Sequence, residues 1–100
     1  MIKHIVMWKL KDHAEGNTKA ENAARMKELL DSCAGLVPGL LTVEVALAIP
    51  GLEATYDVIL YSEFTNKAAL DAYQEHPTHQ AIKPFIGAVR LERQCMDYEI

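Results

Sequence analysis

Two histidines and a tyrosine lie within the segment 73–79, which reads Tyr-Gln-Glu-His-Pro-Thr-His. An imidazole can remove a proton next to a carbonyl group, and a phenol can donate a hydrogen bond to the oxygen that becomes negatively charged. Pro77 predicts a corner between two helices, because proline ends one helix and can open the next. At such a corner Tyr73 and His79 could serve acid–base chemistry. The alternative is structural: a His-Pro cap beside a tyrosine that only packs.

The same corner could bind a metal ion, because His76 and His79 are three residues apart and Glu75 is adjacent. Pro77 interrupts the regular helix that such a spacing requires, and no third side-chain ligand is evident. We therefore expect no catalytic metal and no cofactor.

Composition and charge restrict the class of protein. One hundred residues, half of them apolar, indicate a single domain over residues 1–100. The net charge of -4 argues against nucleic acid and membrane as partners. Because the chain has neither a signal-peptide pattern nor an apolar run of about eighteen residues, we expect a cytoplasmic protein. Cys33 and Cys95 lack CxxC spacing and are predicted to be reduced core residues.

The first half of the chain predicts a strand, a helix and a second strand. Residues 2–11 alternate between two faces, and 40–49 are rich in aliphatic and β-branched residues. Thr18 and Glu21 fit a capping box at the start of a helix that continues to about Leu36. The inner face of the first strand consists of Ile2, His4, Val6, Trp8 and Leu10. The buried stripe of the helix is expected to be Ala20, Ala23, Met26, Leu30, Cys33, Ala34 and Val37.

The second half predicts a strand, two short helices and a final strand. Residues 55–64 alternate strongly, and Asn66 is a good N-cap for a helix over 67–75. A second helical piece ends at about Ile86, and 88–99 close the chain as a strand. The inner face of that strand is expected to carry Val89, Leu91, Arg93, Cys95 and Asp97, with Arg90 on the opposite face.

The order βαββαβ indicates an α+β, ferredoxin-like fold, in which helices cover one face of a four-stranded antiparallel sheet. The other face would expose Ile5, Met7, Ile59 and Tyr61. Apolar patches of this kind usually mark interfaces, and a two-fold dimer is the commonest way to cover one. We expect a homodimer through this face.

Several segments together carry a family resemblance: His4, Pro38-Gly39, residues 56–64, residues 69–79 and Asp97-Tyr98. They resemble the stress-responsive dimeric α/β-barrel (Dabb) family over essentially the whole chain. The resemblance implies a homodimer whose two sheets close into a barrel with the helices outside.

The resemblance also implies a site. In the best understood enzyme of the family, the plant olivetolic acid cyclase, a pocket between sheet and helices closes a polyketide by an aldol step. The match implies that His79 acts as the base and that Tyr73 assists the proton transfer. Residues expected to contact a substrate are His4, Val6, Trp8, Met26, Leu30, Val58 and Arg93. Some relatives hold a structural cation, here Mg or Na, on backbone carbonyls that would be those of Ala34, Val37 and Leu40.

The sequence departs from that cyclase at positions that would shape the pocket. Aromatic helix positions fall on Met26, Lys27 and Leu30, and two apolar positions of the last strand fall on Arg90 and Arg93. An arginine on the inner face needs a partner, because an unpaired buried guanidinium is costly. We expect Arg93 to pair with an acid, to receive the carboxylate or phosphate of a small ligand, or to reach the rim.

Three functions therefore stand beside one another. The chain could be a cofactor-free cyclase or lyase acting on a small carbonyl compound, a module that binds a small apolar or anionic molecule, or a stress-related dimer without a ligand. Cofactor-free oxidation, as in monooxygenases with the same barrel, is a weaker alternative. A pocket on which His4, Tyr73 and His79 converge would favour the first two.

Overall fold

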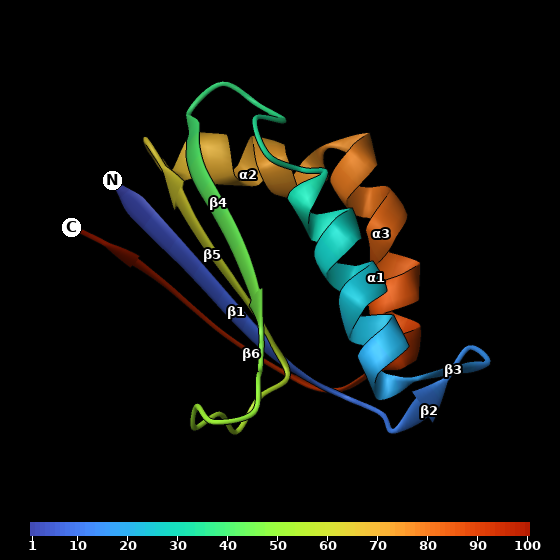
Figure 1. Ribbon diagram of the computed structural model, residues 1–100. Coiled ribbons are helices and arrows are strands. Elements are labelled where there is room, and N and C mark those ends of the chain that lie inside the picture. Colours follow the sequence, from blue (N-terminus) through green and yellow to red (C-terminus); the bar gives the residue numbers. More distant parts are fainter.

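The computed structural model describes residues 1–100. The protein consists of a four-stranded antiparallel sheet and a layer of helices (Figure 1). The sheet has the order β4-β5-β1-β6. Its strands are β1 (Ile2–Leu10), β4 (Leu40–Leu47), β5 (Val58–Phe64) and β6 (Arg90–Glu99), and a small hairpin joins β2 (His13–Ala14) to β3 (Asn17–Thr18). The helices are α1 (Lys19–Asp31), α2 (Lys67–Glu75) and α3 (Pro77–Val89). The predicted ferredoxin-like fold is confirmed.

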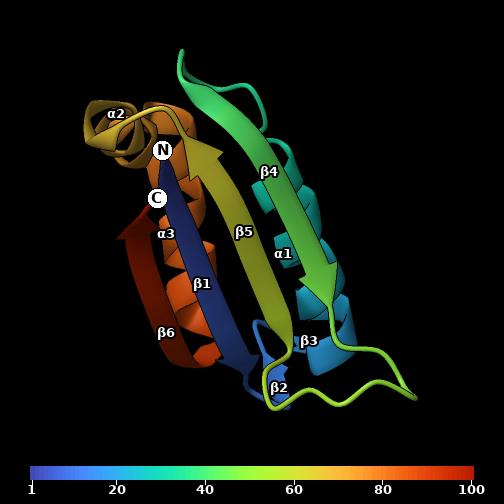
Figure 2. The same ribbon diagram turned by 90° about the vertical axis from the view of Figure 1, so that its left-hand side faces the viewer.

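All three helices lie on one side of the sheet. Figure 1 shows the sheet nearly edge-on with α1 and α3 side by side against it, and Figure 2 shows the bare face toward the viewer. Alternation on β1 decides which side chains enter the core: Val6, Trp8 and Leu10 are buried, whereas Ile5 and Met7 are only half-buried on the bare face. None of the three helices combines the length and the apolar character that a membrane span requires.

Helix α1 begins as predicted and ends earlier. The Glu21 N–H donates to Thr18 Oγ1 and the Thr18 N–H donates to the Glu21 carboxylate, so the capping box is formed. The regular helix stops at Asp31 because the next N–H groups bond only three residues back, Cys33 to Leu30 and Ala34 to Asp31, before Gly35 takes a φ of 69°.

The buried stripe of α1 differs from the expected one. The expected core positions Ala20 and Ala34 are exposed, and Asn22 is buried instead, where its amide donates to the Ala14 carbonyl at 3.0 Å. That hydrogen bond pairs the amide N–H, whereas the Asn22 Oδ1 is buried without a partner.

The later element ends also differ from the predictions. Strand β4 ends two residues early and β5 begins three residues late, because the turn at Pro50-Gly51 belongs to a loop over 48–57. Helix α3 continues through Pro84 to Val89, since the carbonyl that loses its N–H partner belongs to Gln80 on the exposed side.

The two cysteines have different environments. Cys33 is buried as predicted, but Cys95 is exposed. It lies opposite Val6, on the side of the sheet that carries the helices. Because β6 is an edge strand, this side chain stays in contact with solvent, and the prediction of a second core cysteine is wrong.

Candidate functional site

A cavity of about 530 Å³ lies between the sheet and the helix layer. Its walls come from β1, β5, β6, α1 and α3, together with the last residues of α2. The buried residues of the floor are His4, Val6, Trp8, Leu30, Leu60, Ile82 and Ile86. Charged and polar side chains of α2, α3 and β6 surround the mouth. A chamber of this volume, with an apolar floor and a polar mouth, is large enough for a small molecule.

The cavity collects six of the residues predicted for the site, which are His4, Val6, Trp8, Leu30, His79 and Arg93. Met26 and Val58 do not line it and are buried in the core. Their side chains pack in the core between the sheet and the helices, next to the residues that line the cavity.

His4 is the most tightly held polar group of the floor. Its Nδ1 is hydrogen-bonded to the carboxylate of Asp97, which lies directly across the β1–β6 ladder. The Ser62 hydroxyl donates to the His4 backbone carbonyl at 3.1 Å. Since Nδ1 is engaged, Nε2 remains for a partner in the cavity. A carboxylate behind an imidazole fixes the orientation of the ring and stabilises the imidazolium that forms when Nε2 takes a proton.

His79 approaches the same cavity from α3 and is half-buried. Burial lowers the pKa of His79, and the positive charge of Lys83 lowers it further. Its Nδ1 is buried without a hydrogen-bond partner in the protein. The imidazole is therefore neutral at pH 7 and can accept a proton.

Tyr73 lies behind His79 rather than on the cavity wall. Its ring packs against that of His79, with 4.7 Å between centroids, and against Phe64 at 5.3 Å. The hydroxyl is fully buried and has no hydrogen-bond partner, and burial raises the pKa of Tyr73 well above its usual value. Its expected role as a donor to a substrate stays a prediction, whereas its packing fixes the His79 ring.

His76 caps α3, because its Nδ1 accepts the Thr78 N–H at 3.1 Å. His76 therefore has the structural role that the sequence offered as the alternative for the His-Pro corner, and it does not line the cavity. The structure contains no group of three or more side chains suited to a metal ion. At the expected backbone cation site, the Val37 carbonyl accepts the Leu40 N–H, so a cation there stays a prediction.

Arg93 lies on the inner face, opposite Trp8, as predicted. It is exposed at the mouth of the cavity and forms no ion pair with an acid. The prediction that Arg90 faces the other way is wrong, because it lines the same cavity. A register shift in the β1–β6 ladder places Lys9 opposite Glu92 but Leu10 opposite Arg90, so Leu91 is an extra, bulged residue.

Comparison with known proteins agrees with this architecture. A family model described as the stress responsive A/B barrel domain, Dabb, matches residues 2–100. The chain belongs to the Dabb family. No curated protein matches its sequence.

Solved structures of similar proteins extend the comparison. A dimeric protein of unknown function from Bacteroides fragilis is 32% identical, with a TM-score of 0.83 over 99% of this chain and 95% of that one. A Dabb family protein from Mesorhizobium loti is 24% identical, with a TM-score of 0.68 over 99% and 95% of the two chains. An antibiotic biosynthesis monooxygenase is 14% identical, with a TM-score of 0.69 over 100% and 98%, which shows a shared fold alone.

Two functional features of this Dabb chain were not assigned from sequence. Alternation predicts Asp97 on the inner face, but its bond to His4 depends on strand register, which alternation does not determine. Lys83 lies on α3 and lines the mouth of the cavity. The sequence indicates this position only through the spacing of four residues, about one helical turn, between Lys83 and His79.

Proposed function

We propose that this Dabb protein is a homodimeric enzyme that moves protons on a small carbonyl compound bound in the cavity. The observation that carries the proposal is His4 on the cavity floor, held by Asp97 from outside the cavity, with the neutral imidazole of His79 on the same cavity. Two imidazoles in different environments can divide the work of acid and base.

In the proposed step, His79 removes a proton from the carbon next to the carbonyl group. The substrate becomes an enolate, and its oxygen gains the negative charge. His4, held in orientation by Asp97 at Nδ1, donates the proton that it carries on Nε2 to the enolate oxygen, and the proton taken up by His79 is released to solvent. Tyr73 acts as a positioning residue that packs against His79. Such enolates allow both ring closure and carbon–carbon cleavage, which matches a cyclase or lyase.

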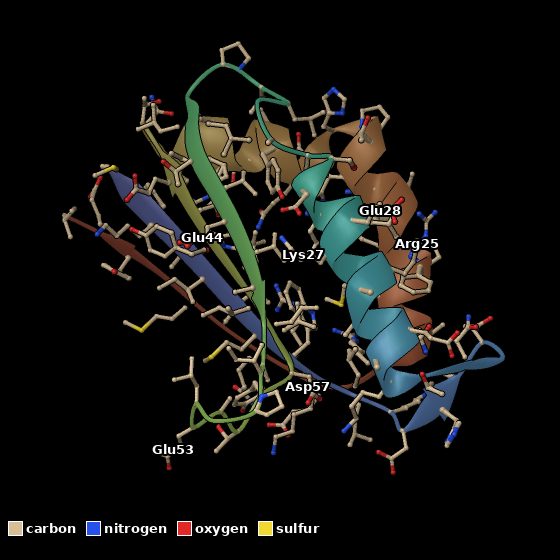
Figure 3. All side chains as sticks on the ribbon, in the orientation of Figure 1. Arg25, Lys27, Glu28, Glu44, Glu53 and Asp57 are labelled. Atoms are coloured by element: carbon tan, nitrogen blue, oxygen red, sulfur yellow. The ribbon has the colours of Figure 1, made fainter.

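Exchange of α-protons tests the chemistry without knowledge of the natural substrate. Benzylacetone in D2O is followed by proton NMR with the wild-type protein, His79→Ala and His4→Ala. General acid–base groups typically contribute about 10²–10⁴-fold, so each variant should lose at least about tenfold of the catalysed exchange. Arg25→Gln is the control, since Arg25 pairs with Glu28 on the outer side of α1 (Figure 3). A wild-type rate no faster than that of an equal concentration of free imidazole would refute an enzymatic role.

Binding without catalysis is the second candidate. It is favoured by the Trp8 indole N–H, which is buried at the cavity without a hydrogen-bond acceptor. A ligand oxygen would satisfy this donor, because buried polar groups are normally paired. Saturable ligand binding together with no proton exchange would select this function over the first.

The dimer is proposed from the bare face of the sheet. Ile5 lies between Tyr61 and Met96 across the ladder, and Met7 lies opposite Ile59. Met96 is 66% exposed in the single chain. The Bacteroides fragilis relative is dimeric, and packing two such faces would bury this apolar strip. Ile59→Glu should convert the dimer to a monomer in light scattering, and Arg25→Glu should not.

A further inference from the structure

We infer that the cavity receives a small amphipathic carboxylic acid whose carboxylate binds Lys83, Arg90 and Arg93 at the mouth while its apolar part lies on the floor. The inference rests on the proposed function, because it takes the cavity as the ligand site. It adds the chemical class of the ligand.

The bulge at Leu91 is the structural basis of the anion site. On a regular strand, residues three apart point to opposite faces of the sheet. Here Arg93 lies opposite Trp8 and Arg90 lies opposite Leu10, and both Trp8 and Leu10 are inward-facing core residues. The extra residue, Leu91, is 68% exposed. It thereby places two guanidinium groups on one side of the sheet, where β-bulges commonly re-aim side chains.

The charges at the mouth are unbalanced. The cavity is lined by three cations, Lys83, Arg90 and Arg93, against one carboxylate, that of Glu75, which leaves an excess of two positive charges (3 − 1). None of these four groups takes part in an ion pair within the chain. Glu92, the nearest acid on β6, is engaged elsewhere with Lys9 and the Tyr56 hydroxyl.

Unpaired cations that converge from a helix and a strand repel one another, and an anion between them removes that repulsion. Guanidinium groups bind carboxylates through paired, charge-assisted hydrogen bonds. The positive charges of Lys83 and Arg93 both lower the pKa of His79, which lines the same cavity.

The floor is suited to the apolar remainder of such a ligand. Leu30, Leu60, Ile82 and Ile86 are buried around it, and the chamber holds about 530 Å³. Trp8 is 4% exposed, and its indole N–H has no acceptor. A ligand oxygen near this donor, in addition to the carboxylate at the mouth, would satisfy it.

Trp8 also provides the assay, because it is the only tryptophan of the chain and lines the cavity. Its fluorescence is titrated with octanoate and with 1-octanol, which share an eight-carbon chain and differ in the charge of the head group. We expect octanoate to bind at least about tenfold more tightly than octanol at low salt, and the difference to shrink as salt screens the cations.

Charge-removing variants locate the anion site. Arg93→Gln and Arg90→Gln should each weaken octanoate binding by at least about threefold, and the double variant by at least about tenfold, with octanol binding unchanged. Unchanged octanol binding also shows that the variants remain folded. Arg25→Gln, which removes an arginine already paired with Glu28 on α1, should change the affinity for neither octanoate nor octanol.

The outcomes separate this inference from the function on which it rests. Equal affinity for octanoate and octanol, or octanoate binding insensitive to both arginine variants, would overturn the acid preference and leave the cavity as a ligand site. No fluorescence response to either molecule would overturn the inference and the proposed ligand site together.

Discussion

Asp97→Asn tests the pair that carries the proposed chemistry. The substitution removes the negative charge behind His4 and leaves a side chain of nearly the same size. A hydrogen bond to a charged group contributes about 1.5–3 kcal/mol. Because the Asp97 side chain is 43% exposed and solvent screens part of that interaction, we expect a loss of about 1–2 kcal/mol in the free energy of unfolding.

The effect on catalysis should be larger than the effect on folding. Asparagine cannot stabilise the imidazolium of His4, and its amide can hold the ring in the wrong tautomer. His79 remains, so we expect proton exchange on benzylacetone to fall by about 10–100-fold rather than to vanish. Affinity for octanoate should stay within about twofold, because Asp97 does not line the cavity.

Urea denaturation at a fixed protein concentration measures the first quantity, and proton NMR in D2O measures the second. Asp71→Asn is the matched control, because it removes the same charge from a surface pair with Lys67 at 2.9 Å. That pair contributes about 0.3–0.5 kcal/mol and touches no part of the cavity. If a folded Asp97→Asn protein exchanged protons at the wild-type rate, Asp97 would have a structural role only. The proposed acid–base roles of His4 and His79 would then be wrong.

Three further perturbations probe the supporting structure. Met26→Ala removes a fully buried side chain and should cost about 2–5 kcal/mol in urea denaturation; a loss below about 1 kcal/mol would mean that the core is not packed around it. Gly39 has a φ of 88°, and a Cβ there would lie 2.6 Å from Thr65 Oγ1 and 2.8 Å from Ala69 Cβ, so Gly39→Ala should lower stability by more than about 1 kcal/mol. The pKa of His79 is lower in the folded than in the unfolded chain, so the unfolded state binds more protons once the pH falls below about 6.5. Stability should therefore be lost as the pH falls from that value through the folded pKa, and His79→Asn should flatten the dependence; an unchanged profile in the variant would assign the pH sensitivity to other groups.

Local patterns were sufficient for most of the fold. The capping box at Thr18 and the Asn66 cap predicted the starts of α1 and α2, and the span 67–75 matches α2 residue for residue. Alternation placed His4 and Trp8 on the inner face of β1 correctly. These features depend on neighbours within a few positions, which the sequence contains directly.

The site was less predictable, because it depends on contacts between distant segments. The bulge that turns Arg90 inward exists only in the pairing of β6 with β1, and alternation along β6 alone gives the opposite face. The position of Tyr73 behind His79 follows from how α2 and α3 meet. Likewise, the exposure of Cys95 follows from the place of β6 at the edge of the sheet.

The bulge at Leu91 also bears on how the chain avoids aggregation. An edge strand offers unpaired N–H and C=O groups, onto which a strand of another molecule can add. On β6 the extra residue breaks the regular spacing of those groups near Arg90, and charged side chains follow it at Glu92 and Arg93. A neighbouring chain would therefore meet an irregular start of the edge, although Glu92–Glu99 beyond it keep a regular register with β1. The same extra residue that directs an arginine to the cavity thus also interrupts one end of this edge of the sheet.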